Sequence, residues 1–482
     1  MATNIIWFRR DLRLNDHPAL WQAAQEGFII PLYILDPEES AGAAERWWRH
    51  HSLQQLRDTL SRRGIPLILR RGNPLQILIA VIAATRATGV FWNRRYDPTG
   101  IAQDTAIKTH LRSKGITVRS FAGDCLVEPW LHEHNGLPHK VFTPFWKSLL
   151  ARFSIAAPLP EPELLPLPEY RAEVLKCEAL EDWCLLPTQP DWALGFMDYW
   201  APGEAGAQTR FANFLDDGLD SYSKERNFPA RNSVSRLSPH LAHGEISPRQ
   251  IWQQTRTYLC QDPTLEKQGE HFLRELGWRE FSWHLLFHFP SLPDIPLRAE
   301  FADFPWQNNA ELWQRWCAGQ TGYPIVDAGM RELWHTGWMH NRVRMICASF
   351  LIKDLLIPWQ KGADWFGDTL VDADLANNSV SWQWVAGCGA DAAPYFRIFN
   401  PVLQGEKFDP EGTYVRRWVS ELAALPDRYI HQPWNADAAQ LKYFGLTLDL
   451  QYPRPIIDHL QARRRAMDAF QSLGKAEQSG IS

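Results

Sequence analysis

The first 125 residues alternate between short apolar runs and amphipathic segments, and this alternation limits the possible folds more than any other feature of the chain. The apolar runs have the length and the β-branched and aromatic content of strands. One segment between them, residues 45–63, places Trp48, Leu53, Leu56 and Leu60 on one side of a helix. Strands that alternate with helices are typical of a parallel, doubly wound sheet. We predict strands at residues 4–8, 28–35, 66–70, 90–93 and 117–121.

Three arginines, Arg9, Arg10 and Arg13, follow the first predicted strand. Doubly wound sheets bind ligands at the carboxyl ends of their strands, so these residues are candidates for a ligand site. A solvated basic turn explains them equally well. The G-x-G-x-x-G fingerprint of dinucleotide-binding domains does not follow this strand.

Strand-like runs disappear beyond residue 204, and helical periodicity dominates, for example over residues 265–289. Five prolines within residues 158–168 indicate an extended linker. We therefore expect an α/β domain with a doubly wound parallel sheet over residues 1–130, an interdomain linker over 131–203 and an all-α domain over 204–475.

Composition excludes several classes of protein. The formal net charge of −5 argues against a generally basic nucleic-acid-binding surface, so any DNA binding must come from a local basic face. The seven cysteines have no zinc-site spacing and do not suggest a secreted disulfide framework. Charges begin at Arg9, so no signal peptide is expected, and the longest apolar run, residues 77–84, is too short to span a bilayer. We expect a soluble, cytoplasmic protein.

Residues 336–401 are rich in tryptophan, paired acids and amides, in a chain with 24 tryptophans. Val343, Ile346, Phe350 and Leu351 can share one helical face. Gly362, Gly367 and the polar run 372–381 are expected to break the helices and form loops. Short acids, amides and rings on such turns suit a pocket for a large polar aromatic ligand, although a tryptophan-rich helical core is the simpler explanation for any single ring.

Several motifs in this stretch resemble the FAD-binding domain of the DNA photolyase/cryptochrome family. They are TGYPIVDAGMR (321–331), GWMHNRVRM (337–345), DADLANN (372–378), WQW (382–384) and FRIFNP (396–401), with WFRRDLRLND (7–16) near the N-terminus. The resemblance covers nearly the whole chain and lies closest to the bacterial class I photolyases that repair cyclobutane pyrimidine dimers.

The resemblance implies a reduced, anionic FAD in the helical domain and an antenna pigment, a folate or a deazaflavin, in the first domain. Asp372 would pair with Arg344 beside the flavin ring, and Asn378 would face its N5, because an amide can both donate and accept. Val234 replaces the usual Thr beside the diphosphate. No metal is expected, because no His or third acid completes a set with Asp372 and Asp374. The implied FAD contacts are Tyr222, Val234, Ser235, Arg236, Leu237, Ser238, Phe272, Glu275, Arg279, Asn341, Arg344, Asp372, Ala373, Asp374 and Asn378.

The resemblance also assigns a DNA lesion site. Glu275 would hydrogen-bond a flipped pyrimidine dimer, with Asn378 as the second catalytic residue, and Trp278 and Trp384 would sandwich the dimer. An ordinary helix salt bridge between Glu275 and Arg279 is the alternative for that pair. The implied DNA and lesion contacts are Arg226, Glu275, Trp278, Arg279, Asn341, Arg342, Met345, Trp384, Arg397, Gln404 and Lys407.

Trp382, Trp359 and Trp306 resemble the family's electron relay from the surface to the flavin, although three core rings would show the same spacing. The implied function is light-dependent repair of cyclobutane dimers in UV-damaged DNA, by a monomer with no obligate protein partner. Two alternatives stay open: a cryptochrome-type blue-light photoreceptor with the same pocket, and a flavoprotein that binds DNA without repairing it. The chain ends soon after its last expected helix, without the long tail of many cryptochromes, which favours the enzyme.

Overall fold

The computed structural model describes residues 2–134, 136–165 and 175–479, and its chain divides into two compact units. Unit 1 comprises residues 1–220, 235–290 and 371–374, and unit 2 comprises residues 221–234, 291–370 and 375–482. Each unit is thus assembled from segments that are far apart in the sequence.

A five-stranded parallel sheet forms the first half of unit 1, in the strand order β3-β2-β1-β4-β5. All five predicted strands are present, each within two residues of its expected bounds. The order reverses beside β1, which lies between β2 and β4, and this is the switch point where such sheets bind ligands. The strands are β1 (Ala2–Phe8), β2 (Gly27–Leu35), β3 (Ile68–Arg71), β4 (Gly89–Asn93) and β5 (Thr117–Phe121).

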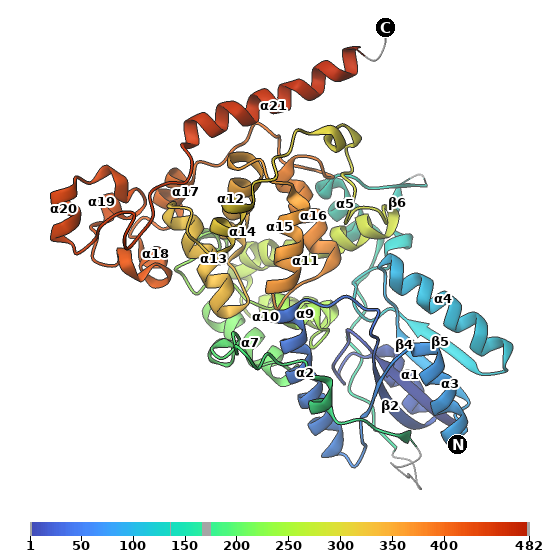
Figure 1. The fold of residues 1–482 in the computed structure, drawn as a ribbon. Coiled ribbons are helices and arrows are strands. Elements are labelled where there is room, and N and C mark those ends of the chain that lie inside the picture. The colour runs from blue at the N-terminus through green and yellow to red at the C-terminus, as the bar shows by residue number, and fades with distance from the viewer. Residues whose placement is uncertain (1, 135, 166–174, 480–482) are drawn as a thin grey trace. The chain divides into compact units, whose positions relative to one another are not determined.

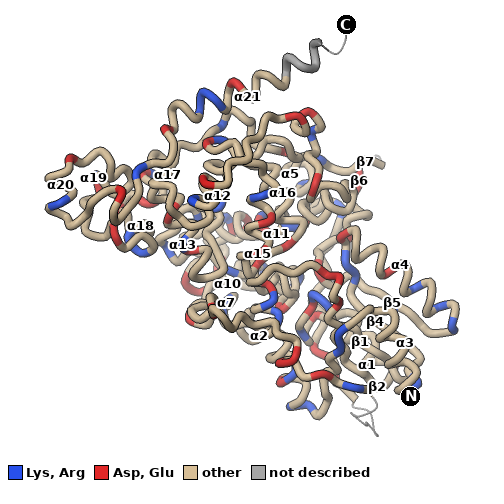
Figure 2. Tube along the Cα trace, viewed as in Figure 1, with Lys and Arg blue, Asp and Glu red and all other residues tan. Residues whose placement is uncertain are grey.

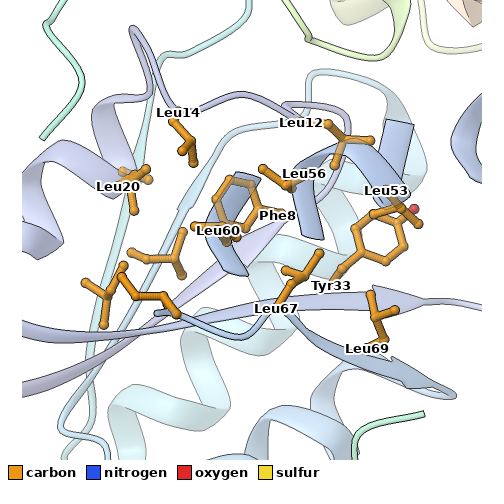
Figure 3. Close-up of a cluster of buried hydrophobic side chains, with 14 of the residues drawn as sticks. Phe8, Leu12, Leu14, Leu20, Tyr33, Leu53, Leu56, Leu60, Leu67 and Leu69 are labelled. Carbon is orange, nitrogen blue, oxygen red and sulfur yellow. The ribbon is translucent and has the colours of Figure 1, made fainter. Parts of the chain in front are cut away.

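Helices cover both faces of this sheet (Figure 1). Phe8 and Leu20 pack with Leu53, Leu56 and Leu60 on one face, so the predicted apolar side of the 45–63 segment is buried there (Figure 3). The other face contains a second core. The first core includes side chains of α1 (Pro18–Glu26) and α2 (Ala43–Ser61), and the second includes side chains of α3 (Pro74–Thr85) and α4 (Pro98–Ser113).

The rest of unit 1 is mainly helical, and the predicted helix over 265–289 is present as α11 (Glu266–His288). Residues 158–165, the first part of the proline-rich stretch within the expected linker, contain no helix or strand, and residues 166–168 lie outside the described residues. The remaining elements of unit 1 are η1 (Pro129–Leu131), β6 (Glu133–His134), β7 (Leu137–Pro138), α5 (Phe142–Arg152), η2 (Leu180–Trp183), η3 (Phe196–Asp198), α7 (Glu204–Asp217), α9 (Ser238–Ala242), α10 (Pro248–Gln261) and η4 (Pro263–Leu265).

Unit 2 consists of helices, among which a π-helical turn, η6 (Phe350–Asp354), follows α14 (Asn341–Ser349). The expected fold class, an α/β sheet domain followed by an all-α domain, is confirmed. The other elements are α8 (Tyr222–Glu225), η5 (Ala299–Asp303), α12 (Ala310–Cys317), α13 (Pro324–Thr336), α15 (Trp359–Thr369), α16 (Leu375–Ala386), α17 (Pro401–Phe408), α18 (Thr413–Trp418), η7 (Ser420–Leu422), α19 (Asp427–Ile430), η8 (Pro433–Asn435), α20 (Ala438–Tyr443) and α21 (His459–Ser479).

The expectation that glycines and polar residues break the helices over 362–381 is wrong. Gly362 and Gly367 lie inside α15, and residues 375–381 belong to α16. Glycine costs roughly 1 kcal/mol in a helix, but a Cβ at Gly362 would lie 2.1 Å from the Trp382 ring. The glycine therefore allows α15 and α16 to approach closely, and only residues 370–374 remain as a connection between them.

Basic and acidic residues are interspersed along both units rather than segregated (Figure 2). Among the described residues, no helix is long and apolar enough to cross a membrane. Within the same residues, no three His, Cys, Asp or Glu side chains are grouped so that they could hold a metal ion.

Candidate functional site

Helix α11 presents Glu275, Trp278 and Arg279 at positions i, i+3 and i+4, so they share one face. Glu275 and Trp278 are partly exposed, while their neighbours Leu276 and Gly277 are buried. Arg279 donates from Nη1 to the backbone carbonyl of Asp124 at 2.6 Å. Glu275 and Trp278 are thus accessible to a ligand, whereas Arg279 already donates a hydrogen bond within the protein.

Glu280, the next residue of α11, is a buried acid that the sequence did not single out. Its Oε2 accepts hydrogen bonds from the backbone N–H groups of Leu126 (2.8 Å) and Val127 (3.2 Å). Burial raises the pKa of this carboxyl to about 7, although Arg279 and the two N–H donors act in the opposite direction. Glu280 therefore fixes residues 126–127 to the helix that carries Glu275 and Trp278.

We expect Glu280→Gln to change how stability depends on pH. The folded protein holds the proton of Glu280 more tightly than the unfolded chain, so this group lowers the free energy of unfolding as pH rises from about 4.5 to about 7. A Gln oxygen can accept the same N–H donors without becoming charged. The variant should therefore be more stable than the original protein at pH 8, by up to about 3 kcal/mol, and not at pH 4.5. Urea unfolding at both pH values measures this. The prediction is refuted if the free energies of unfolding of the two proteins differ by the same amount at pH 8 and at pH 4.5.

The connection that carries Asp372 and Asp374 is anchored within unit 1. His243 lies with Nε2 3.2 Å from the carbonyl oxygen of Val371, and its ring stacks on Trp48 at 5.7 Å. Asp374 also lies close enough to Arg10 to contribute to the raised pKa of that guanidinium, after the larger effect of Glu45. Contacts within unit 1 therefore help to place this connection, which the sequence did not predict.

Residues 233–238, which include three serines and Arg236, have a strained backbone and lie near a second arginine. Arg236 has φ 50°, in the left-handed region that non-glycine residues rarely adopt outside special sites. Burial, and after it the positive charge of Arg236, lower the pKa of Arg210, from α7, to about 10. The neighbouring Ser233 hydroxyl is buried without a hydrogen-bond partner in the described structure. Two mutually repelling arginines in unit 1 favour the binding of an anion such as a diphosphate. The sequence analysis did not include Arg210 among the candidate residues, because it lies in a separate helix.

Three further arginines gather in unit 2, where the DNA contacts are expected. Burial lowers the pKa of Arg342, and the charges of Arg226 and Arg397 lower it further. Arg342 is oriented by the side chain of Asn227, whose Oδ1 accepts from its Nη2 at 2.7 Å, and by Phe408, 4.6 Å from the guanidinium to the ring centroid. Repulsion among three cations falls when phosphates bind between them, so this cluster is suited to a DNA backbone.

The loop that carries Arg397 is held by a buried lysine. Lys353, in the π-helical turn, donates from Nζ to the carbonyl oxygen of Arg397 at 3.0 Å. Burial lowers the pKa of Lys353 to about 8, with Arg397 contributing in the same direction. Nearby in unit 2, Phe408 also lines a pocket of about 260 Å³, whose other lining residues are Glu225, Phe228, Ala230, Arg231, Asp409, Pro410, Glu411 and Thr413.

Arg344 and Asn378 are each oriented by a hydrogen bond to a backbone carbonyl within unit 2. Arg344 donates from Nε to the carbonyl of Met339 at 2.7 Å. Asn378 donates from Nδ2 to the carbonyl of Ala363 at 2.8 Å, so its Oδ1 and its second N–H can serve a ligand. Both arrangements are suited to the polar edge of a flavin.

Asn341 and His340 are adjacent at the start of α14 but differ in exposure. Asn341 is the exposed first residue of the helix, and Met345 is partly exposed one turn later. His340 is buried as the N-cap, where its Nδ1 accepts from the N–H of Arg342 at 3.2 Å. Its backbone N–H donates to Glu332 at 3.2 Å. The imidazole is therefore part of the helix start rather than of the exposed surface beside Asn341.

The tryptophans proposed as a relay all lie in unit 2, with Trp382 and Trp359 buried and Trp306 partly exposed. Trp382 packs on Gly362, one turn from Trp359 along α15. A second series of rings also begins at Trp382, and the sequence did not predict it. Its centroid distances are 6.5 Å to Trp316, then 5.4 Å to Trp313, 6.2 Å to Trp365 and 6.2 Å to Trp334, which is 49% exposed.

The arginines at the end of β1 form ion pairs, and Arg9 and Arg13 are buried, which corrects their interpretation as a solvated turn. Arg9 pairs with Asp104 at 2.6 Å, and Arg13 with Asp124 at 3.0 Å. Arg10, which is more exposed, pairs with Glu45. Their acidic partners come from distant segments, so the sequence could not reveal them. Arg9 and Arg13 therefore stabilise the end of the sheet.

The predicted FAD contacts are divided between the units, and each set consists of groups that fit FAD. The predicted contacts in unit 1 include serine hydroxyls, two arginines and three acids, while those in unit 2 include Tyr222, Asn341, Arg344 and Asn378. Phe272 is buried against Phe214 at 4.6 Å and contributes an apolar ring. The unit 1 set is Ser235, Arg236, Leu237, Ser238, Phe272, Glu275, Arg279, Asp372, Ala373 and Asp374, and Val234 belongs to unit 2. Of the DNA contacts, Trp384 and Gln404 are partly exposed, and Lys407 is exposed, all in unit 2.

Two family models match the two halves of the chain. Residues 4–163 match the DNA photolyase family model, and residues 272–472 match the model of the FAD binding domain of DNA photolyase. The chain is 50% identical over 479 residues to the deoxyribodipyrimidine photo-lyase of Agrobacterium fabrum, covering 98% of each protein. It is 39% identical to Cryptochrome-2 of Arabidopsis thaliana, covering 98% of this chain and 79% of that protein. The crystal structure of a bacterial class III photolyase from Agrobacterium tumefaciens superimposes with a TM-score of 0.96 at 50% identity over 98% of each chain. The chain therefore belongs to the DNA photolyase/cryptochrome family.

Proposed function

We propose that this protein is a deoxyribodipyrimidine photo-lyase that repairs cyclobutane pyrimidine dimers in UV-damaged DNA in response to light. The observation that carries the proposal is the face of α11, where Glu275 and Trp278 are accessible on a helix whose other side is buried. Identity of 50% over the full length to a protein with this name supports the same activity. Splitting of a defined dimer under blue light tests it.

Arginine and aromatic side chains of the protein bind and orient the damaged DNA. Arg226, Arg342 and Arg397 hold the phosphates on either side of the lesion, and the dimer leaves the base stack to enter the site. Trp278 stacks on one base of the dimer, and Glu275 donates to or accepts from its polar edge. Trp384 contributes a second ring from unit 2. Closing these groups around the dimer excludes water.

Reduced FAD, when bound, supplies the electron that splits the dimer after light absorption. Arg236, Arg344, Asp374 and Asn378 are the residues that would hold this cofactor, because their charged and amide groups suit its diphosphate and the polar edge of its ring. We also propose an antenna pigment, a folate or a deazaflavin, in the sheet domain. The buried pairs of Arg9 and Arg13 argue that it is not held by these two arginines.

Within the family, we propose class III rather than the class I expected from the motifs. The support is the class III photolyase of known structure that shares 50% identity and superimposes with a TM-score of 0.96. We further propose that the protein acts as a cytoplasmic monomer. The alternative function is a cryptochrome-type photoreceptor, which the 39% identity to Cryptochrome-2 supports. The two differ in whether bound dimers are split by light.

We expect Arg344→Ala to lose FAD. The resemblance assigns Arg344 as the charged partner of Asp372, and removal of a charged partner is costly for a buried acid such as Asp372. Flavin absorbance per mole of purified protein should fall several-fold. Asp374→Ala should act in the same direction. Arg315→Ala, an arginine of α12 outside the predicted site, is the control and should keep its flavin. Full occupancy in both site variants would show that the pocket is assigned to the wrong residues.

A further inference from the structure

One face of the Trp278 ring is covered by Phe142. The two rings are parallel, with centroids 3.8 Å apart and 8° between their planes. This separation is close to van der Waals contact between flat rings, so they overlap over much of their area. Because Trp278 is otherwise partly exposed, a nucleobase can stack only on the indole face that is turned away from Phe142.

Phe142 itself is fixed at the start of α5 and is 1% exposed. It lies parallel to Trp146 at 6.4 Å and edge-on to Phe281 at 5.9 Å. The guanidinium of Arg274 lies 5.4 Å from the centroid of the Phe142 ring. These contacts leave Phe142 little freedom to change rotamer, so it forms a rigid support.

The helices that carry the two rings approach closely because of Gly277, the residue before Trp278. A Cβ at this position would come within 2.6 Å of the Trp146 ring. Trp278 also meets Phe281 edge-on at 5.9 Å, so its ring is held from a second side. The orientation of Trp278 is therefore determined before any ligand arrives.

We propose that Phe142 is a positioning residue for lesion recognition, which holds Trp278 so that the free indole face receives one base of the extruded dimer. The inference rests on the proposed function, which assigns stacking to Trp278. A side chain that is already ordered loses less conformational entropy when it binds. This gain in affinity applies to damaged DNA, because only a flipped dimer reaches the Trp278 ring. It does not apply to the phosphate contacts, which damaged and undamaged DNA both make.

The test compares Phe142→Leu with Phe145→Leu in the full-length, flavin-loaded protein in the dark. Phe145 lies on the same helix, is equally buried and contacts Phe281 at 5.1 Å, so it controls for loss of a buried ring. The measured quantity is the ratio of affinities for matched oligonucleotides with and without one cyclobutane dimer. Phe142→Leu should lower this ratio by about three- to tenfold, with affinity for undamaged DNA unchanged. Phe145→Leu should preserve it. An equal fall in both variants would overturn the inference.

A double-mutant cycle with Trp278→Leu separates this inference from the proposed function. Phe142→Leu should cause no further loss of the ratio in the Trp278→Leu protein, because its effect passes through the missing indole. If Trp278→Leu lowers the ratio but Phe142→Leu does not, the inference fails and the lesion site stands. If Trp278→Leu leaves the ratio unchanged, the assignment of the lesion site fails and the inference fails with it. Phe142→Met replaces Phe142→Leu in the cycle if the leucine variant does not fold.

Discussion

Trp382→Phe should abolish photoreduction of the oxidised flavin and leave repair by chemically reduced enzyme intact. Trp382 is 2% exposed, packs on Gly362 and contacts the Trp316 ring, so both ring routes begin at it. Phenylalanine keeps a ring in place but is much harder to oxidise than indole. Flavin absorbance under blue light with an external reductant measures the effect. Trp92→Phe, a buried indole of the sheet domain, is the control and should photoreduce normally.

The two routes beyond Trp382 can be distinguished by further variants. Trp359→Phe interrupts the route expected from the resemblance, and Trp316→Phe interrupts the series that reaches the exposed Trp334. If both routes supply electrons, each single variant should retain part of the photoreduction rate, and the double variant should lose it. Normal photoreduction in Trp382→Phe would contradict both routes.

The protein should repair cyclobutane dimers and leave (6-4) photoproducts unchanged. Reversal of a (6-4) product moves a group between bases and needs a general acid beside the lesion. Asn341 and Met345 occupy the accessible face of α14, and neither an amide nor a thioether can donate a proton at neutral pH. His340, the neighbouring imidazole, is 2% exposed and caps the helix.

Matched oligonucleotides that carry one or the other lesion measure this specificity. The dimer substrate should be restored under blue light, with the (6-4) substrate unchanged after the same exposure. Restoration of the (6-4) substrate would refute the prediction and make His340 the first residue to replace. The Tyr414 hydroxyl, which donates to Glu332 at 2.6 Å in the same buried network, would be the second.

The elements with a strong local pattern were predictable from the sequence. The five strands follow from alternating apolar runs, and α11 follows from its 3.6-residue period, because in both cases burial of one face determines the structure. The connection over residues 362–381 was predicted wrongly, because the advantage of Gly362 is a contact with Trp382 in another helix. Local propensity gives no signal for such a contact.

For the candidate site, the sequence yields a proposed set of residues and not their arrangement. Motifs marked Glu275, Arg344 and Asn378, but the contacts that orient the last two are backbone carbonyls, which carry no sequence signal. The partners of Arg9 and Arg13 come from segments more than 90 residues away. The stack of Phe142 on Trp278 joins α5 to α11 and was invisible for the same reason.

The proposed photo-lyase activity is tested by light-dependent restoration of an oligonucleotide with a single cyclobutane thymine dimer by the flavin-reduced protein. Pyrimidine absorbance should recover under blue light, with no recovery in the dark or in a matched reaction with Glu275→Ala at the same flavin content. A protein that binds the damaged oligonucleotide with reduced flavin but leaves the dimer intact after illumination would contradict the assignment of a photo-lyase and favour a photoreceptor.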